Sequence, residues 1–454
     1  MARIKRKMGQ SEMGLLIRVI RAIRGSIFGP VAFSVEAGGG MLADSKVSAP
    51  SNTADCSYLF DVKRRIGKGW AALAASTFLL AVSSCATAAA AGPEFLLSTA
   101  TLRDVASLLE PIRARLKLPA LAVMVIRSNA VVGSGVVGQR KWGVSEPVTL
   151  ADKWHQGSIT KSMTATLAAL LVQDGRLHWD TPLGEVFAGR AAAMHPQWRT
   201  VTLEQLLSHR GGAPDMAWLE QQHIWGQAWN FGGTPWEARR LLLDQVTAQA
   251  PPAKPGSQYI YSNAGYAFAG AMLEEVMKHP WEELITERLF GPLGMASAGF
   301  GVPATPRYIN QPWGHVFTNG VPSPVAPGPD ADNPPAIGPA GTVHCSAPDL
   351  ARYVGFQLSG ARGEPGLLLR PESFSRLHHD PDGDGYALGW NEGRRDWAQG
   401  RTLSHTGSNN QWYSNVWLAP ERNWACLVLT NIGGDAAFSA TDAVVEAMIA
   451  QFRP

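Results

Sequence analysis

Strand patterns occur near both ends of the globular part of the chain, and a long helical stretch separates them. Apolar runs with strand character cover 120–126 and 130–137 and form a hairpin candidate. Similar runs return late in the sequence, at 386–390, 402–405, 411–418 and 424–430. Because a sheet buries its faces only when its strands are assembled together, we expect the two ends to combine. The sequence therefore predicts an α/β (α+β) fold: a mixed, largely antiparallel sheet built from both termini, flanked by helices, with an inserted all-helical domain.

Apolar residues at helical spacing dominate the middle of the chain. The segments with this pattern are 158–173, 203–208, 235–249 and 264–278, with further helices expected at 101–115, 348–358 and 436–452. Glycine and proline are frequent at 301–340, after the last of the central helical segments. We assign residues 93–454 to one domain, with an α/β part at about 95–150 and 340–454, a helical part at about 152–300 and a Pro/Gly-rich excursion at 301–340.

Basic residues are concentrated at the N-terminus. Residues 1–68 hold twelve Lys and Arg but five Asp and Glu, so a chain with a formal net charge of +3 has an acidic remainder. Residues 1–62 show no clear helical or strand period. We interpret them either as part of an over-extended reading frame, with the true translation start near Val62, or as a long basic, disordered leader. The basic charge therefore does not indicate a nucleic-acid-binding protein, and no motif for one is present.

Residues 63–92 have the order of a secretory signal peptide: a basic segment at 63–68, an uncharged apolar run at 70–82, then small residues. The apolar run is much shorter than the roughly 20 residues of a membrane-spanning helix. The segment that ends at Cys85 resembles a lipobox, which would make Cys85 a lipidation site, while the following alanines suit ordinary cleavage equally well. We expect an exported protein, periplasmic or at the outer surface, with membrane contact only through a lipid on Cys85.

Three short motifs carry candidate chemistry. In Ser158-Ile159-Thr160-Lys161, the spacing of three places a hydroxyl and an amine one turn apart on the same helix face. The helix dipole would favour the serine alkoxide, and burial would lower the pKa of the lysine. In Tyr261-Ser262-Asn263, a tyrosine at a helix entrance can act as a general base and an asparagine amide can orient a substrate. In His405-Thr406-Gly407-Ser408, glycine permits close approach of a substrate to a strand edge.

Together and in this order, the motifs resemble those of the serine β-lactamase and penicillin-binding protein superfamily: class C β-lactamases, DD-carboxypeptidases, esterases and D-aminopeptidases. The resemblance extends over roughly 100–450 and includes further segments, at 206–209, 290–295, 338–341, 349–351 and 386–390. It implies the β-lactamase/transpeptidase-like fold and an exported serine hydrolase that cleaves an ester or amide through an acyl-enzyme, with no cofactor and no metal. The implied partner is a small-molecule or peptide substrate: a D-amino acid peptide, an ester or a β-lactam.

The resemblance also implies roles for individual residues. Ser158 would be the nucleophile, Lys161 its activating partner, and Tyr261 the general base and then acid. Substrate contacts would come from Asn263, His405, Thr406 and Gly407. The backbone N–H groups of Ser158 and Ser408 would form the oxyanion hole.

One position departs from the class C β-lactamase pattern, because His405 stands where those enzymes carry lysine. An unperturbed histidine titrates near pH 6.5, so capture of a substrate carboxylate is less assured. We therefore expect slow or absent β-lactam hydrolysis. A weak β-lactamase, and a catalytically silent protein that binds peptidoglycan or a partner, remain the alternatives to a carboxypeptidase, aminopeptidase or esterase.

Other features of the sequence have two interpretations each. Cys345 and Cys426 could form a disulfide or be two buried thiols. The segment 380–385 imitates the start of a calcium loop, but we favour a plain turn because its twelfth position is not glutamate. His378 and His379 are expected at the surface. Four tryptophans form either an aromatic flap over the cleft or, as we favour, part of the helical core: Trp218, Trp225, Trp229 and Trp236.

Overall fold

The computed structural model describes residues 102–128, 130–364 and 368–453. The predictions made for 1–62, for the signal peptide at 63–92 and for Cys85 fall outside these residues and stay predictions. Within the described part of the chain, no helix combines the length and the apolar character that crossing a membrane requires.

A seven-stranded sheet in the order β1-β3-β2-β12-β11-β10-β9 joins the two ends of the described chain. Its strands are β1 (Arg103–Asp104), β2 (Ala120–Arg127), β3 (Ala130–Gly138), β9 (Asn391–Arg395), β10 (Gly400–Ser408), β11 (Tyr413–Ala419) and β12 (Trp424–Thr430). Only the β1–β3 pair is parallel, and the expected hairpin is the antiparallel β2–β3 pair. The predicted fold class, a largely antiparallel mixed sheet built from both ends, is therefore confirmed.

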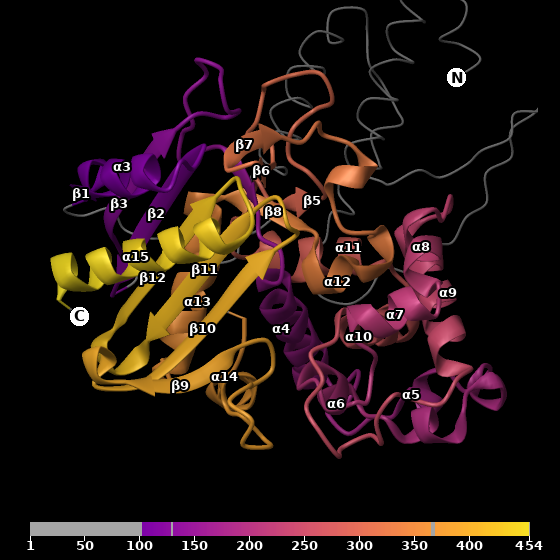
Figure 1. Cartoon of the computed structure of the whole chain (residues 1–454). Coiled ribbons are helices and arrows are strands. Elements are labelled where there is room, and N and C mark those ends of the chain that lie inside the picture. The colour runs from indigo at the N-terminus through magenta and orange to yellow at the C-terminus, as the bar shows by residue number, and fades with distance from the viewer. Residues whose placement is uncertain (1–101, 129, 365–367, 454) are drawn as a thin grey trace, which may run out of the picture. The chain divides into compact units, whose positions relative to one another are not determined.

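The central strands are buried on both faces. Along β2, Leu121 and Val123 join one hydrophobic cluster whereas Ala122 and Met124 join another, as the period of two in a strand requires. The first face is covered by α3 (Ala106–Arg115) and α15 (Asp435–Phe452), and the second by α13 (Ala347–Ala361) (Figure 1). The result is a three-layer α/β part in which β10 presents its end to the neighbouring helix α4.

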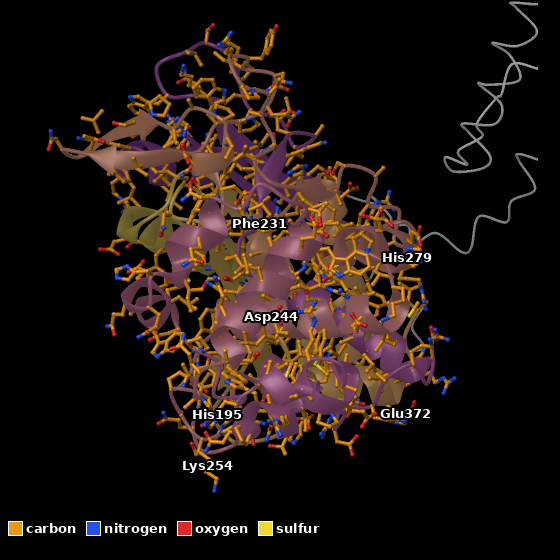
Figure 2. The ribbon with its side chains drawn as sticks, turned by 90° about the vertical axis from the view of Figure 1, so that its right-hand side faces the viewer. His195, Phe231, Asp244, Lys254, His279 and Glu372 are labelled. Atoms are coloured by element: carbon orange, nitrogen blue, oxygen red, sulfur yellow. The ribbon has the colours of Figure 1, made fainter. Side chains whose placement is uncertain are left out.

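Helix α4 (Ile159–Gln173) lies between the sheet and the remaining helices, as Figure 1 shows. Almost all of its residues are buried, because it packs on α10, α12 and α14 as well as on β10. The helical part comprises α5 (Leu183–Val186), α6 (Leu203–Leu207), α7 (Met216–Gln221), α8 (Ile224–Trp229), α9 (Pro235–Thr247), α10 (Asn263–Met277) and α11 (Trp281–Ile285), which runs into a π-helical turn at Thr286–Phe290. Figure 2 shows this side, with Asp244 of α9 near its middle.

The Pro/Gly-rich excursion is more regular than the sequence indicates. It contains the hairpin β6 (His315–Thr318) and β7 (Val321–Pro324), and β5 (Gly299–Phe300) precedes it in a small sheet with β8 (Val343–Ser346) and β4 (Lys153–His155). Residues 329–342, here called the strap, connect two short 3-10 turns to the short helix α12 (Gly338–Gly341) and lead into β8. The strap brings the end of the excursion against the start of α4.

Two local expectations are wrong. The segment 386–390 is not a strand: Gly389 adopts φ +86°, and a Cβ there would lie 2.5 Å from Ser162 Cα, so the chain bends sharply where it passes α4. His378 is buried rather than at the surface, since it shares the apolar face of α14 (Pro371–His378) with Phe374 and Leu377, although His379 is exposed. Its Nε2–H donates to Gln357 Oε1 at 2.8 Å, and burial lowers its pKa to about 3.

The remaining alternatives are resolved by burial. Cys345 and Cys426 are separate, buried free thiols. All four tryptophans are half-buried: Trp218 and Trp225 pack on the main core, Trp229 meets Trp225 edge to face, and Trp236 lies under Arg240. The four tryptophans therefore lie at the margin of the helical core.

Candidate active site

Ser158 lies at the N-cap of α4, directly after a turn at Gly157 with φ +50°. A Cβ on Gly157 would lie 2.3 Å from Ser408 N, and one on Gly407 would lie 1.9 Å from Gln156 O. The two glycines therefore allow the turn that carries Ser158 and the end of β10 to touch. Among the described residues the Ser158 amide has no acceptor. The structure thus brings together the two amides, of Ser158 and Ser408, that the sequence proposes as an oxyanion hole.

Lys161 is fully buried one turn further along α4. Its Nζ lies 3.0 Å from Ser158 Oγ, 2.7 Å from Asn263 Oδ1 and 2.8 Å from Ala340 O. Burial lowers the pKa of Lys161 well below the usual lysine value. The amide and carbonyl oxygens only accept, so a neutral amine uses its two N–H groups on them and turns its lone pair toward the serine hydroxyl.

Tyr261 and Asn263 are placed at the entrance of α10. The N-cap Ser262 accepts from Gly265 N at 2.9 Å and donates to Pro214 O at 2.6 Å, which holds this entrance in place. The ring centre of Tyr261 lies 4.8 Å from Lys161 Nζ. Although Tyr261 as a residue is 38% exposed, burial of its surroundings raises the pKa of the phenol, and a hydrogen bond with Ser158 opposes the rise.

His405 lies on β10 and is held on both sides. Its Nδ1 is 2.6 Å from Thr406 O, which can only accept, so Nδ1 carries the proton and Nε2 accepts from Tyr386 Oη at 3.1 Å. Burial lowers the pKa of His405 to about 4, and protonation of Lys161 would lower it further. The imidazole is therefore neutral at pH 7, and both of its nitrogens are engaged.

Thr406 shares a hydrogen bond with Tyr413, whose pKa is raised by burial and lowered in part by this bond. Tyr413 packs on the cluster under α15. The Thr406 hydroxyl is therefore tied to that face of the sheet, whereas Gly407 remains at the contact with the serine turn.

His209, which sequence reasoning included in a family segment without a role, lies at the centre of the site. Its buried ring contacts four tyrosine rings, and Nδ1 accepts from Ser262 N at 3.1 Å. These rings are Tyr259, Tyr261, Tyr266 and Tyr386. Burial lowers the pKa of His209 well below the usual range, and protonation of Lys161 or His405 would lower it further. His209 therefore stays neutral and braces the Tyr261–Asn263 loop.

The acidic segment 380–385 closes one edge of the site as a turn. Asp380 accepts from the backbone N–H groups of Asp382, Gly383 and Gly385. Asp384 pairs with Arg210, the residue after His209. Burial and Asp384 raise the pKa of Tyr259 to about 12. The segment therefore forms a turn held by Asp380, and within the described residues no group of three or more His, Cys, Asp or Glu is arranged to hold a metal ion.

Comparison with known proteins gives consistent similarities. The β-lactamase family profile matches residues 105–451. Penicillin-binding protein 4 of Amycolatopsis lactamdurans is 28% identical over 331 residues, which are 71% of this chain and 82% of that protein. The octameric penicillin-binding protein homologue from Pyrococcus abyssi has a TM-score of 0.62 at 23% identity and covers 76% of both chains. D-amino acid amidase from Ochrobactrum anthropi, solved with L-phenylalanine amide, has a TM-score of 0.60 at 20% identity and covers 76% of this chain and 97% of its own.

Proposed function

The chain belongs to the β-lactamase family, and from this premise we propose that it is a serine hydrolase that cleaves an ester or amide through an acyl-enzyme on Ser158. One observation carries the proposal: a buried Lys161 Nζ lies 3.0 Å from Ser158 Oγ, with its two other contacts on oxygens that only accept. A serine hydroxyl needs an adjacent base to become nucleophilic, and this amine is such a base.

The pKa directions support one order of proton transfers. The lowered pKa of Lys161 favours the free amine, so Lys161 takes the hydroxyl proton while Ser158 Oγ attacks the substrate carbonyl. The raised pKa of Tyr261 favours the protonated phenol, so Tyr261 donates a proton to the leaving oxygen or nitrogen. This order reverses the one expected from the resemblance, in which Tyr261 acts first as a base. Water then attacks the ester on Ser158: the Tyr261 phenolate takes a proton from the water, and Lys161 returns its proton to Ser158 Oγ as the acyl group leaves as the acid.

Charge that develops on the substrate carbonyl oxygen would be stabilised by backbone donors. The N–H groups of Ser158 and Ser408 belong to the two segments that the glycines Gly157 and Gly407 bring into contact. Such donors cost no reorganisation during the reaction, and each contributes about 3 to 4 kcal/mol where it has been removed in other hydrolases.

The state of His405 supports a substrate without a free carboxylate next to the cleaved bond. Its imidazole is neutral and occupied by Thr406 O and Tyr386 Oη, so it supplies no fixed positive charge. Lys161 is held by its own acceptors and Arg210 by Asp384. We therefore favour esters and amides, including D-amino acid amides of the kind named for the Ochrobactrum relative, over carboxypeptidase or β-lactamase substrates.

Covalent labelling tests the proposed nucleophile. A fluorophosphonate probe is expected to modify the native protein at Ser158 and to leave Ser158→Ala unlabelled, because only an activated hydroxyl attacks phosphorus at a useful rate. Ser257→Ala is the matched control, since Ser257 is exposed and bonds only locally to Lys254 O. Labelling is followed by gel fluorescence and peptide mass. An unlabelled native protein would favour the catalytically silent alternative.

A matched pair of substrates tests the preference for uncharged groups. We expect an acyl-D-Ala-D-Ala carboxamide to be hydrolysed with a kcat/KM at least about 10-fold above that of the same peptide with a free carboxylate. One missing charge-assisted hydrogen bond corresponds to roughly this factor. Nitrocefin, which also carries a carboxylate, should be turned over slowly or not at all. Faster cleavage of the free acid, or nitrocefin turnover comparable with that of the amide, would contradict the assignment.

A further inference from the structure

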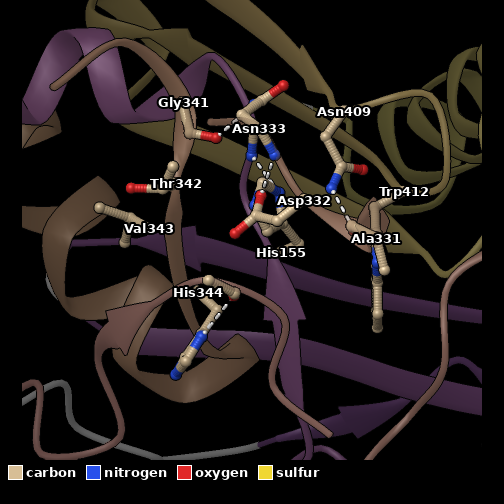
Figure 3. A network of polar contacts seen from close by, with 12 residues as sticks. His155, Ala331, Asp332, Asn333, Gly341, Thr342, Val343, His344, Asn409 and Trp412 are labelled. Atoms are coloured by element: carbon tan, nitrogen blue, oxygen red, sulfur yellow. Dashed lines mark hydrogen bonds and ion pairs between the residues drawn. The ribbon is translucent and has the colours of Figure 1, made fainter. Parts of the chain in front are cut away.

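The turn that carries Ser158 is held from behind by a histidine–aspartate pair that the mechanism above does not use. His155 is the last residue of β4, and Asp332 lies on the strap, 177 positions further along the chain. The side chain of His155 is 0% exposed and that of Asp332 is 9% exposed. Figure 3 shows the two residues facing each other below Asn333.

The hydrogen bonds of His155 determine its tautomer. Gly157 N–H donates to His155 Nδ1 at 3.1 Å, so Nδ1 carries no proton. The proton of the neutral ring is then on Nε2, which donates to Asp332 Oδ1 at 2.7 Å. Asp332 thus selects the only tautomer that can accept the Gly157 N–H. In the opposite tautomer, two N–H groups would face each other and push the turn before Ser158 away.

The same strap also contacts the base. Asp332 Oδ1 accepts from Asn333 N at 2.7 Å, and Asn333 Nδ2 donates to Gly341 O at 2.8 Å (Figure 3). Next to Gly341, Ala340 O accepts from Lys161 Nζ at 2.8 Å. The strap is therefore connected to both reacting partners: to Ser158 through His155 and Gly157, and to Lys161 through Ala340.

We propose that His155 and Asp332 are positioning residues for the acylation of Ser158: Asp332 fixes the tautomer of His155, and His155 fixes the amide of Gly157 and with it the serine turn. The inference rests on the proposed function, because it assigns a role within the same site. Neither residue touches the substrate. Their effect is on the alignment of Ser158 Oγ with Lys161 Nζ and of the Ser158 amide with the end of β10, where small misplacements cost about 10- to 100-fold in rate.

Four variants separate positioning from general stability. Asp332→Asn keeps an oxygen that accepts from His155 Nε2–H, whereas Asp332→Ala removes it. His155→Gln keeps a donor for Asp332 but has no acceptor at the position of Nδ1, where the Gly157 N–H points. Asp349→Ala is the control, because Asp349 is also buried but lies away from the serine turn: it accepts from Ser297 N at 2.7 Å and pairs with Arg352 at 3.8 Å. For each folded variant we would measure the second-order rate of fluorophosphonate labelling, kcat and KM for an ester, and the melting temperature.

We expect Asp332→Ala and His155→Gln to lower the labelling rate and kcat by about 10- to 100-fold while KM changes by less than about 3-fold. Asp332→Asn should retain most of the labelling rate and of kcat. Asp349→Ala should have a lower melting temperature but an unchanged labelling rate and kcat. Wild-type rates in Asp332→Ala or His155→Gln would overturn the inference, as would an Asp332→Asn as slow as Asp332→Ala. If Asp332→Ala does not fold, the labelling rates and kcat of His155→Gln and Asp332→Asn are compared instead. A slow His155→Gln beside a nearly native Asp332→Asn supports the inference, and equal rates overturn it. An unlabelled wild type would instead reject the proposed function.

Discussion

Replacement of Lys161 with methionine is expected to lower kcat/KM and the rate of covalent labelling by about 10³- to 10⁴-fold. The variant fills a similar volume but removes the nitrogen that lies 3.0 Å from Ser158 Oγ. Loss of a positioned base costs hydrolases roughly this factor, while the oxyanion donors remain in place. The measurement is stopped-flow labelling at fixed pH, with circular dichroism to show that the variant is folded.

The control is Lys161→Arg, which keeps a positive charge but cannot lose its proton near neutral pH. If Lys161 acts as a base, this variant is as slow as Lys161→Met. An arginine variant with near-native activity would show instead that Lys161 acts only through its charge.

The pH profile follows from the lowered pKa of Lys161. The amine is active without its proton, so labelling of the wild type should rise with pH and level off well below the usual lysine value of about 10.4. The unfolded chain binds this proton more tightly than the folded one, so the free energy of unfolding also rises with pH between the two pKa values. Lys161→Met lacks this contribution, and its stability should increase less between about pH 7 and pH 9.5.

The largest expected effect on stability belongs to Arg239 on α9. It is fully buried, and its guanidinium donates to Glu274 Oε1 at 2.6 Å, to Glu282 Oε2 at 2.7 Å and to Pro335 O at 3.0 Å. Glu274 is also buried. Arg239→Met is expected to lower the free energy of unfolding by about 3 to 5 kcal/mol, because it leaves a buried carboxylate without its cation. Urea unfolding followed by tryptophan fluorescence measures the change.

The neighbouring Arg240 offers a matched control. It pairs with Glu275 across the same two helices, but both side chains are partly exposed, at 29% and 22%. Arg240→Met should therefore change the free energy of unfolding by no more than about 1 kcal/mol. Adding Glu274→Gln to Arg239→Met should recover a large part of the loss. If Arg239→Met and Arg240→Met lowered the free energy of unfolding equally, burial would not be the reason that Arg239 stabilises the fold.

The strap explains why Arg239 matters to the site as well as to stability. Its bond to Pro335 O attaches the strap to the helical part, while His155 attaches the strap to the serine turn through Asp332. Sequence patterns describe residues 301–340 as an irregular, Pro/Gly-rich connection. Proline and glycine do mark the absence of long regular elements, but they say nothing about which carbonyls and carboxylates the segment presents to its neighbours.

Local periodicity is sufficient for the parts of this protein that depend on near neighbours in the chain. The two apolar runs at 120–126 and 130–137 predict the β2–β3 hairpin, and the spacing of three between Ser158 and Lys161 predicts that their side chains meet on one face of α4. Strand patterns at both ends with helices between them likewise imply one shared sheet. These are consequences of a helical period of 3.6 and a strand period of 2, which need no tertiary information.

Tertiary structure decided the chemical state of the site. Burial makes His405 a neutral ring whose two nitrogens are hydrogen-bonded to Tyr386 and to Thr406 O. His378 is buried because it packs on Phe374. His209 gains its tyrosine neighbours, and His155 gains Asp332, from segments far apart in sequence. Protonation depends on desolvation and on the partners that folding brings within hydrogen-bond distance. The sequence by itself therefore determined which residues are the candidates for the proposed chemistry, and the fold decided which of them are neutral, which are held by partners and which face one another.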